Sequence, residues 1–250
     1  MRKVLVVSLI INILFLVFFI VFLINNKSCV VNFSSKLFSG NIKAIQSSMP
    51  APHMPEWYYM NSRHWKEKRA LYEAMPNEPN EIIFVGNSLT FACNWAELLQ
   101  NPKVKNRGIE GDNTEGLLER LDEITESKPE KIFLMMGVND IGYGLSVDEI
   151  TANYRTILTR IKQASPLTRV YVQSVLPIKG LKGRNNDPIV ALNEKLQLLA
   201  GENSAVFINL FPEFLDNDGE LNMSYSYDGL HLNTQGYLLW KSKIENYVSQ

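Results

Sequence analysis

Five short apolar runs alternate with amphipathic segments from residue 82 onward, and this alternation constrains the fold more than any other feature of the sequence. The runs are continuously apolar rather than alternating, which is typical of parallel strands that are covered on both faces. The runs lie at 82–85, 104–108, 132–136, 170–172 and 205–208, and the amphipathic segments lie at 114–126, 147–163, 188–200 and 234–248. We therefore predict an α/β fold, a three-layer α/β/α sandwich with a mostly parallel five-stranded sheet.

The N-terminal segment, 1–25, has a different composition from the rest of the chain. From Val4 to Ile24 every residue is apolar except Ser8 and Asn12. A helix of this length spans roughly 31 Å, which is close to the hydrocarbon thickness of a bilayer. The run predicts one uncleaved N-terminal transmembrane helix that anchors the protein in a membrane.

The charges beside this apolar run predict its orientation. Arg2 and Lys3 precede the run and only Lys27 follows it closely, so the positive-inside rule predicts a cytoplasmic N-terminus and an extracytoplasmic body, periplasmic or extracellular. A cleaved signal peptide is the alternative, but the run is too long, and Asn25 and Asn26 stand where a small-residue cleavage site is expected. We divide the chain into an anchor of the signal-anchor type (1–25), a tether (26–60) and a folded domain (61–250).

Charge and composition exclude several classes of function. Twenty-five Lys and Arg residues against 26 Asp and Glu give a net charge of -1, so the basic footprint of a nucleic-acid-binding protein is absent. Cys29 and Cys93 are too few for a disulfide framework and lack the spacing of a zinc site, and a buried structural thiol is the default for Cys93. Of the histidines His53, His64 and His231, only His231 lies within the α/β part.

The residues that follow each apolar run are the candidates for a site, because the carboxyl ends of parallel strands meet at one edge of the sheet. Ser88 follows the first run, where a serine could act as a nucleophile or only cap the next helix. Gly111 follows the second run in a turn that could present N–H groups to an oxyanion or be an ordinary turn. Asn139 follows the third run, and its amide could donate to an oxyanion or form an Asx turn.

Asp228 and His231 lie between the fifth run and the last amphipathic segment. A carboxylate three residues before an imidazole can accept the Nδ1 hydrogen and leave Nε2 as a base, although an ordinary surface hydrogen bond is the alternative. Each feature taken alone favours its structural interpretation. Together, and in this order, they supply the nucleophile, oxyanion donors, base and orienting acid that acyl transfer needs.

From roughly Asn61 to its C-terminus the chain resembles the SGNH or GDSL-type hydrolases, whose four motif blocks fall in order on Ser88, Gly111, Asn139 and His231. The resemblance implies a flavodoxin-like fold and a reaction that needs no metal or cofactor. It also implies that Ser88 is the nucleophile and His231 the general base oriented by Asp228. The implied oxyanion hole consists of the backbone N–H groups of Ser88 and Gly111 and the side chain of Asn139.

One motif position departs from the family pattern. The first block of the family usually reads Gly-Asp-Ser, and this chain has Gly86, Asn87 and Ser88. Because the triad acid is assigned to Asp228, an isosteric Asn at position 87 is expected to preserve the turn and the activity.

The sequence looks most like the branch with the platelet-activating-factor acetylhydrolase α subunits and bacterial sugar O-acetylesterases. This likeness implies a serine esterase for short acyl groups, O-acetyl above all, on a carbohydrate such as sialic acid or another glycan. A lysophospholipase or other lipid acylhydrolase, an O-acyltransferase with the same triad and a non-catalytic glycan-binding relative are the alternatives. The basic, Gly-rich segment 178–184 could favour an anionic substrate or be a solvated loop. Trp95 and Tyr143 could line the pocket or pack in the interior.

Overall fold

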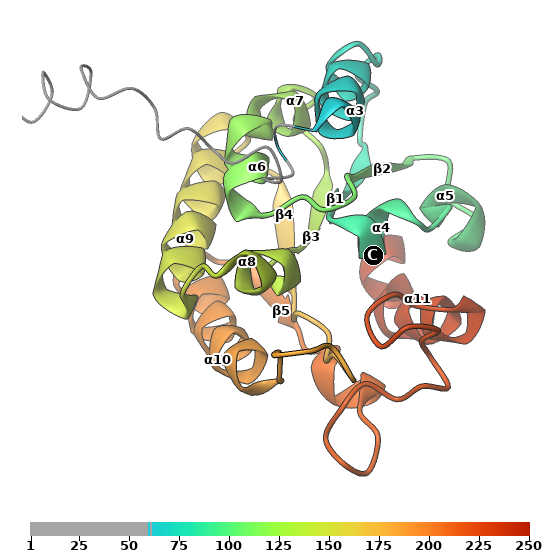
Figure 1. The fold of residues 1–250 in the computed structure, drawn as a ribbon. Helices are drawn as coiled ribbons and strands as arrows, with labels where there is room; N and C mark the ends of the chain where they lie inside the picture. The colour runs from blue at the N-terminus through green and yellow to red at the C-terminus, as the bar shows by residue number, and fades with distance from the viewer. Residues whose placement is uncertain (1–59, 61) are drawn as a thin grey trace, which may run out of the picture. The chain divides into compact units, whose positions relative to one another are not determined.

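The computed structural model describes Met60 and residues 62–250 (Figure 1). The predicted anchor, 1–25, lies outside the described residues, as does the predicted tether, 26–60, apart from Met60. Within the part that is described, no helix combines the length and the apolar character needed to cross a bilayer.

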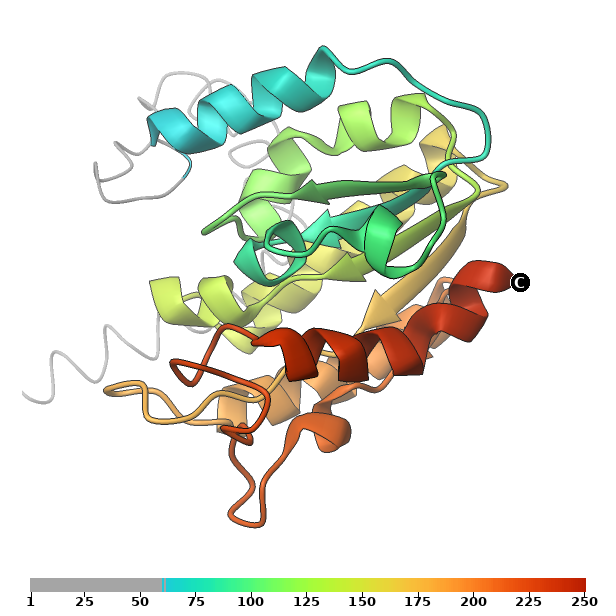
Figure 2. The same cartoon turned by 90° about the vertical axis from the view of Figure 1, so that its right-hand side faces the viewer.

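Five parallel strands form one sheet in the order β2-β1-β3-β4-β5. The strands are β1 (Ile82–Gly86), β2 (Val104–Gly108), β3 (Lys131–Met135), β4 (Arg169–Gln173) and β5 (Val206–Ile208). The five predicted strands are confirmed, with ends that move by one or two residues at most. Figure 2 shows the arrowheads pointing toward α8, the loop after β4 and the loop before α11, so the carboxyl edge of the sheet faces these segments.

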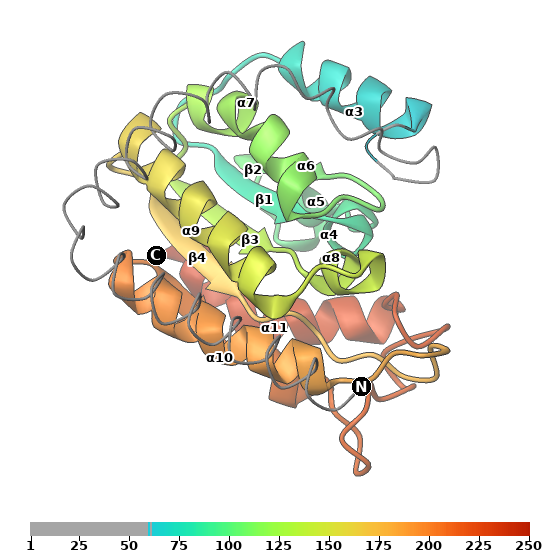
Figure 3. The same cartoon turned by 60° about the vertical axis from the view of Figure 1, so that its left-hand side comes forward.

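Helices cover both faces of the sheet (Figures 1 and 3) and give the predicted three-layer architecture. One face packs against α6 (Thr114–Glu119), α7 (Leu121–Glu126), α9 (Val147–Ala164) and α10 (Asp187–Glu202). The other face packs against α4 (Ser88–Phe91), α5 (Trp95–Leu98) and α11 (Thr234–Ser249). The remaining elements are α3 (Arg63–Glu73), α8 (Val138–Tyr143) and the 3₁₀ helix η2 (Phe211–Phe214).

Aromatic side chains on neighbouring strands stack across the sheet on the α11 face. Phe84 of β1 is paired in register with Phe133 of β3, which is paired with Tyr171 of β4. The ring centroids are 4.7 Å apart in the first pair and 4.6 Å apart in the second. Trp95 stacks on Phe84 at 4.6 Å and is 1% exposed, so it is a core residue and does not line a pocket. These stacked rings support the register of the three central strands, of which β1 is followed by Ser88 and β3 by Asn139.

One predicted helix is wrong in its continuity. The segment 114–126 forms two helices, α6 and α7, because the backbone leaves the helical region at Arg120, where φ is -120° and ψ is 13°. The Arg120 side chain is fully buried and donates to the backbone carbonyl of Arg107 at 2.8 Å. The spacing of apolar residues does not show this break, because the Arg120 side chain bonds to a residue outside the segment 114–126.

Candidate active site

Ser88, His231 and Asp228 form one hydrogen-bonded chain at the carboxyl edge of the sheet. Ser88 Oγ lies 3.1 Å from His231 Nε2, although the two residues are 143 positions apart in the sequence. His231 Nδ1 lies 2.7 Å from Asp228 Oδ2. When Nδ1 carries its hydrogen toward the carboxylate, Nε2 is left as the acceptor for the serine proton. The geometry is therefore that of a nucleophile, a base and a residue that orients the base.

The position of Ser88 depends on Asn87, which follows β1 directly. The Asn87 side chain is 1% exposed and its Oδ1 accepts a hydrogen bond from the N–H of Leu89 at 3.0 Å. Asn87 is therefore the N-cap of α4, and Ser88 is the first residue of the helix rather than its cap. The departure from the family's Asp at position 87 keeps an oxygen acceptor in the place where the turn needs one.

The loop that carries His231 is held by its own polar residues. Ser226 Oγ donates to the backbone carbonyl of His231 at 2.7 Å and accepts from the N–H of Gly229 at 2.9 Å. Asp228 Oδ1 accepts from the N–H groups of Leu230 and His231, at 2.9 and 2.7 Å. Partial burial raises the pKa of Asp228, but the hydrogen bonds from the His231 ring and from these backbone groups outweigh it and hold the pKa below its usual value. The carboxylate therefore stays ionised beside the imidazole.

Gly111 and Asn139 follow β2 and β3, whose last residues are paired in register with Gly86 of β1, so they lie at the same edge of the sheet as Ser88. Asn139 lies in α8, after β3, and its Nδ2 donates to the backbone carbonyl of Asp112 at 2.9 Å. Gly111 adopts a φ of +70°, a conformation that favours glycine because other residues meet steric strain there. Among the residues that the structure describes, the N–H groups of Ser88 and Gly111 have no acceptor in the chain. Two backbone donors and one amide are thus available to stabilise an oxyanion.

Tyr143 has a positioning role that the sequence did not reveal. Its hydroxyl donates to the backbone carbonyl of Gly111 at 2.9 Å, one helical turn after Asn139 on the same helix. Tyr143 and Asn139 therefore hold the carbonyls of two consecutive loop residues, Gly111 and Asp112, from one face of α8. The spacing of four residues on a helix is the signal that could have indicated this pairing.

A buried ion pair holds the loop after β2 that carries Gly111 and Asp112. Arg120 Nη2 lies 2.8 Å from Asp112 Oδ2, and both side chains are 0% exposed. Trp65 of α3 donates its Nε1 hydrogen to Asp112 Oδ1 at 2.8 Å. Burial raises the pKa of Asp112, whereas Arg120 and Trp65 lower it by stabilising the carboxylate. In the sequence, Arg120 stands among leucines at helical spacing, and this position was the one sign that its charge is buried.

Asp140 is a second buried carboxylate beneath the candidate oxyanion hole. Its Oδ1 accepts from both the N–H and the hydroxyl of Thr114 at the start of α6, and no group in the described part of the chain donates to its Oδ2. Burial raises the pKa of Asp140 to about 6. The contact ties α8 to α6 directly behind Asn139.

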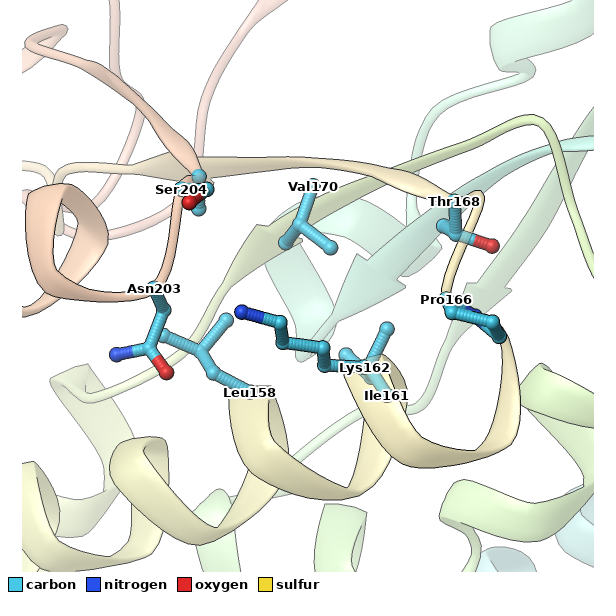
Figure 4. Close-up of a pocket in the computed structure, with 9 residues that line it drawn as sticks. Leu158, Ile161, Lys162, Pro166, Thr168, Val170, Asn203 and Ser204 are labelled. Carbon is cyan, nitrogen blue, oxygen red and sulfur yellow. The ribbon is translucent and has the colours of Figure 1, made fainter.

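Cys93 and one surface pocket lie outside this arrangement. Cys93 is a free, buried thiol, and burial raises its pKa to about 12, so it is not a nucleophile near neutral pH. Figure 4 shows a separate pocket of about 100 Å³ between the C-terminal part of α9 and the amino end of β4, where Lys162 is the one charged lining residue. This pocket lies at the edge of the sheet opposite Ser88 and contains no part of the triad.

A three-layer α/β/α sheet with a serine–histidine–aspartate chain at its carboxyl edge is the arrangement of a serine-dependent acyl hydrolase. A sequence model of the GDSL-like Lipase/Acylhydrolase family matches residues 84–239. This match covers more than half of the chain, and the chain belongs to that family. The protein is accordingly a hydrolase of ester bonds.

Two known proteins and one solved structure are similar to this chain. The α1 subunit of platelet-activating factor acetylhydrolase IB from Pongo abelii is 29% identical over 180 residues, which cover 68% of this chain and 75% of that protein. An N-acylneuraminate cytidylyltransferase from Escherichia coli O18:K1:H7 (strain RS218 / NMEC) is 31% identical over 196 residues, 73% of this chain but 46% of that protein. A solved structure from Streptococcus pneumonia, described as a platelet activating factor, has 32% identity and a TM-score of 0.67, covering 74% of this chain and 91% of that one.

Proposed function

We propose that this protein is a serine esterase that removes short acyl groups, acetyl above all, from a carbohydrate such as sialic acid or another glycan. One observation carries the proposal: Ser88, His231 and Asp228 are joined by hydrogen bonds of 3.1 and 2.7 Å beside two backbone N–H groups and the Asn139 amide. These are the groups that formation and breakdown of an acyl-enzyme require.

In the first half of the proposed reaction, Ser88 Oγ attacks the carbonyl carbon of the ester. His231 Nε2 takes the serine proton, and the ionised Asp228 stabilises the imidazolium that forms. The negative charge on the former carbonyl oxygen is stabilised by the N–H groups of Ser88 and Gly111 and by Asn139, and one such donor typically contributes a factor of about 10²–10³ to the rate. His231 then protonates the leaving alcohol, and the acyl group remains on Ser88.

In the second half, water replaces the alcohol. His231 takes a proton from the water, whose oxygen attacks the acyl carbonyl, and the same donors stabilise the second oxyanion. Collapse of the intermediate returns the proton to Ser88 Oγ and releases the carboxylic acid. An alcohol in place of water would give an acyltransferase, so the acceptor rather than the triad separates these two functions.

The choice of acyl group and alcohol is supported by the relatives. One relative is by name an acetylhydrolase, and it shares 29% identity over 68% of this chain. A second relative is by name an enzyme of N-acylneuraminate, and the region similar to this chain is less than half of that protein. A small acyl group on a sugar acid is the substrate class that fits both likenesses.

The first test is a comparison of the full-length protein with its Ser88→Ala variant on p-nitrophenyl esters from acetyl to octanoyl. We expect the variant to lose turnover, because no other nucleophile lies beside His231 Nε2 within the described residues. Wild-type activity should fall sharply beyond butyryl. Wild-type rates in the folded Ser88→Ala protein would refute the proposed mechanism, and activity that rises with chain length would replace the sugar ester with a lipid.

We also propose that residues 1–25 anchor the protein in a membrane with the hydrolase domain outside the cytoplasm. The apolar run from Val4 to Ile24 and the cations Arg2 and Lys3 before it support this placement. Alkaline carbonate should leave the protein in the membrane fraction, and protease added to spheroplasts, whose outer envelope is opened and whose cytoplasmic membrane is intact, should digest the domain. Release by carbonate, or protection from the protease, would contradict the proposal.

A further inference from the structure

The loop after β4 extends from the triad side of the site to the oxyanion side. At its beginning, the N–H of Lys179 donates to the backbone carbonyl of Gly229 at 2.9 Å, within the loop that carries Asp228 and His231. Near its end, Arg184 lies against Gly142 of α8, the helix that carries Asn139. Figures 2 and 3 show this golden loop beside α8 and beside the red loop that precedes α11.

The Arg184 guanidinium packs against the backbone of Gly142, three residues after Asn139 in α8. A Cβ atom built on Gly142 would overlap the Arg184 guanidinium, so a side chain at position 142 would displace the end of the arginine from this place. Gly142 follows Asn139 by three residues, and Cβ positions three apart on a helix are about 5–6 Å from each other. The guanidinium therefore lies within about 9 Å of the Asn139 Cβ position, beside the helix that carries the amide of the proposed oxyanion hole.

The charge of Arg184 is not neutralised, in contrast to that of Lys179 in the same loop. Lys179 Nζ lies 2.5 Å from Asp216 Oδ2 and 3.4 Å from Glu220 Oε2, so two carboxylates compensate it. Arg184 is exposed, and within the described residues no carboxylate oxygen lies within ion-pair distance of it. A planar guanidinium presents paired donors that match a carboxylate or a phosphate. The loop thus brings one uncompensated cation of this kind to α8, the helix that carries Asn139.

We propose that Arg184 determines substrate specificity by binding an anionic group of the ester substrate, a carboxylate or a phosphate, while the acyl carbonyl lies at Ser88. This inference rests on the proposed esterase function and assigns to it the charge of the substrate. Arg184 takes no part in the transfer of protons or of the acyl group. Its effect is to bind and orient the substrate, so the Michaelis constant should respond to its removal more than kcat does.

The test measures the preference of the full-length protein for a charged ester over its neutral counterpart. The first pair of substrates is O-acetylated sialic acid and its methyl ester, and the second pair is acetylated glycerol phosphate and acetylated glycerol. The measured quantity is the ratio of kcat/KM for the charged ester to kcat/KM for the neutral one. If Arg184 binds a carboxylate, this ratio is above one for the first pair of substrates. If Arg184 binds a phosphate, the ratio is above one for the second pair.

We expect Arg184→Gln to lower this ratio about tenfold, mainly through KM, because a charge-assisted hydrogen bond at an exposed site is lost. Gly142→Ala should lower it similarly while keeping the charge, because the new methyl group displaces the guanidinium from α8. The matched control is Lys182→Gln, which removes a cation from the same exposed loop without altering this contact and should keep the ratio.

The assignment is overturned if the wild-type ratio is one or less in both pairs, or if either Arg184→Gln or Gly142→Ala keeps the wild-type ratio. These results leave the esterase function intact when p-nitrophenyl acetate is still hydrolysed in a Ser88-dependent way. Failure to hydrolyse every one of these esters would refute the esterase function itself, and the assignment of Arg184 with it.

Discussion

Replacing Arg120 with methionine removes the cation that compensates a fully buried carboxylate. Arg120 donates to Asp112 Oδ2 through Nε at 2.9 Å, and both side chains are 0% exposed. Arg120 Nη1 also lies 3.6 Å from Glu123 Oε1, but Glu123 keeps a second partner, since Arg107 Nε lies 3.3 Å from its Oε2. Asp112 is therefore the group that the substitution leaves without its counter-ion.

The size of the effect follows from this burial. Removing one partner of a buried ion pair costs about 3–5 kcal/mol of stability, because the remaining charge stays desolvated. Asp112 keeps the hydrogen bond from Trp65 Nε1 at 2.8 Å, and burial favours uptake of a proton, so we expect the lower part of that range, about 3–4 kcal/mol. With a urea m-value of about 2–3 kcal/mol per M, the unfolding midpoint should fall by about 1–2 M.

Urea unfolding followed by tryptophan fluorescence measures this shift, and a second variant separates charge from packing. Asp112→Asn combined with Arg120→Met removes the orphaned charge and keeps an acceptor for Trp65. The backbone carbonyl of Asp112, which holds Asn139, is unchanged. The double variant should therefore be more stable than Arg120→Met alone. A midpoint shift below about 0.5 M for Arg120→Met, or a double variant less stable than the single one, would refute the reasoning.

Three further predictions concern the site and its support. Asn139→Ala should lower kcat about 10²–10³-fold with little change in KM, because one oxyanion donor is lost; single-turnover acylation rates measure this, and a loss below about threefold would remove Asn139 from the oxyanion hole. Folded Asp140, whose burial raises its pKa to about 6, binds a proton more tightly than unfolded Asp, so its ionisation should lower stability by about 3 kcal/mol as the pH rises from about 4 to 6. Asp140→Asn should remove that part of the pH dependence in urea midpoints, and an unchanged slope would argue against it. Asn87→Asp should alter kcat less than about threefold, because the acceptor for Leu89 N–H is kept; a much larger gain on p-nitrophenyl acetate would mean that Asp does more than hold the turn.

The strands and the long helices were predictable because the order of apolar and polar residues along each segment reflects which of its faces are buried. Continuous apolar runs mark strands that are covered on both faces, and the run at 82–85 became β1 with only Gly86 added. The longer amphipathic segments became α9, α10 and α11 with ends that shift by one or two residues. The short helices α5 and α8 were not predicted, because four to six residues are too few to show a helical period, and the helix expected after Ser88 is only the four-residue α4.

The contacts that support the site were less predictable than its motif residues. Ser88 and Asn139 were found because each follows a strand, and parallel strands bring such residues to one edge, whereas His231 was found through its spacing from Asp228. The bonds from Tyr143 to Gly111 and from Arg120 to Asp112 join segments 32 and 8 residues apart through buried polar groups. Periodicity records which residues are buried and not which partner they meet, so these pairings required the three-dimensional structure.

The loop after β4 is closed by a single residue at its base. Asn186 Oδ1 accepts from the N–H of Ile178 at 2.8 Å, and Asn186 Nδ2 donates to the carbonyl of Ile178 at 3.1 Å. Both ends of the loop are thereby joined at Asn186, and the next residue after Ile178, Lys179, bonds to the carbonyl of Gly229. Residues 180–185 lie beyond these two fixed points, so they are the part of the loop in which substitutions should disturb the serine, histidine and aspartate of the site least.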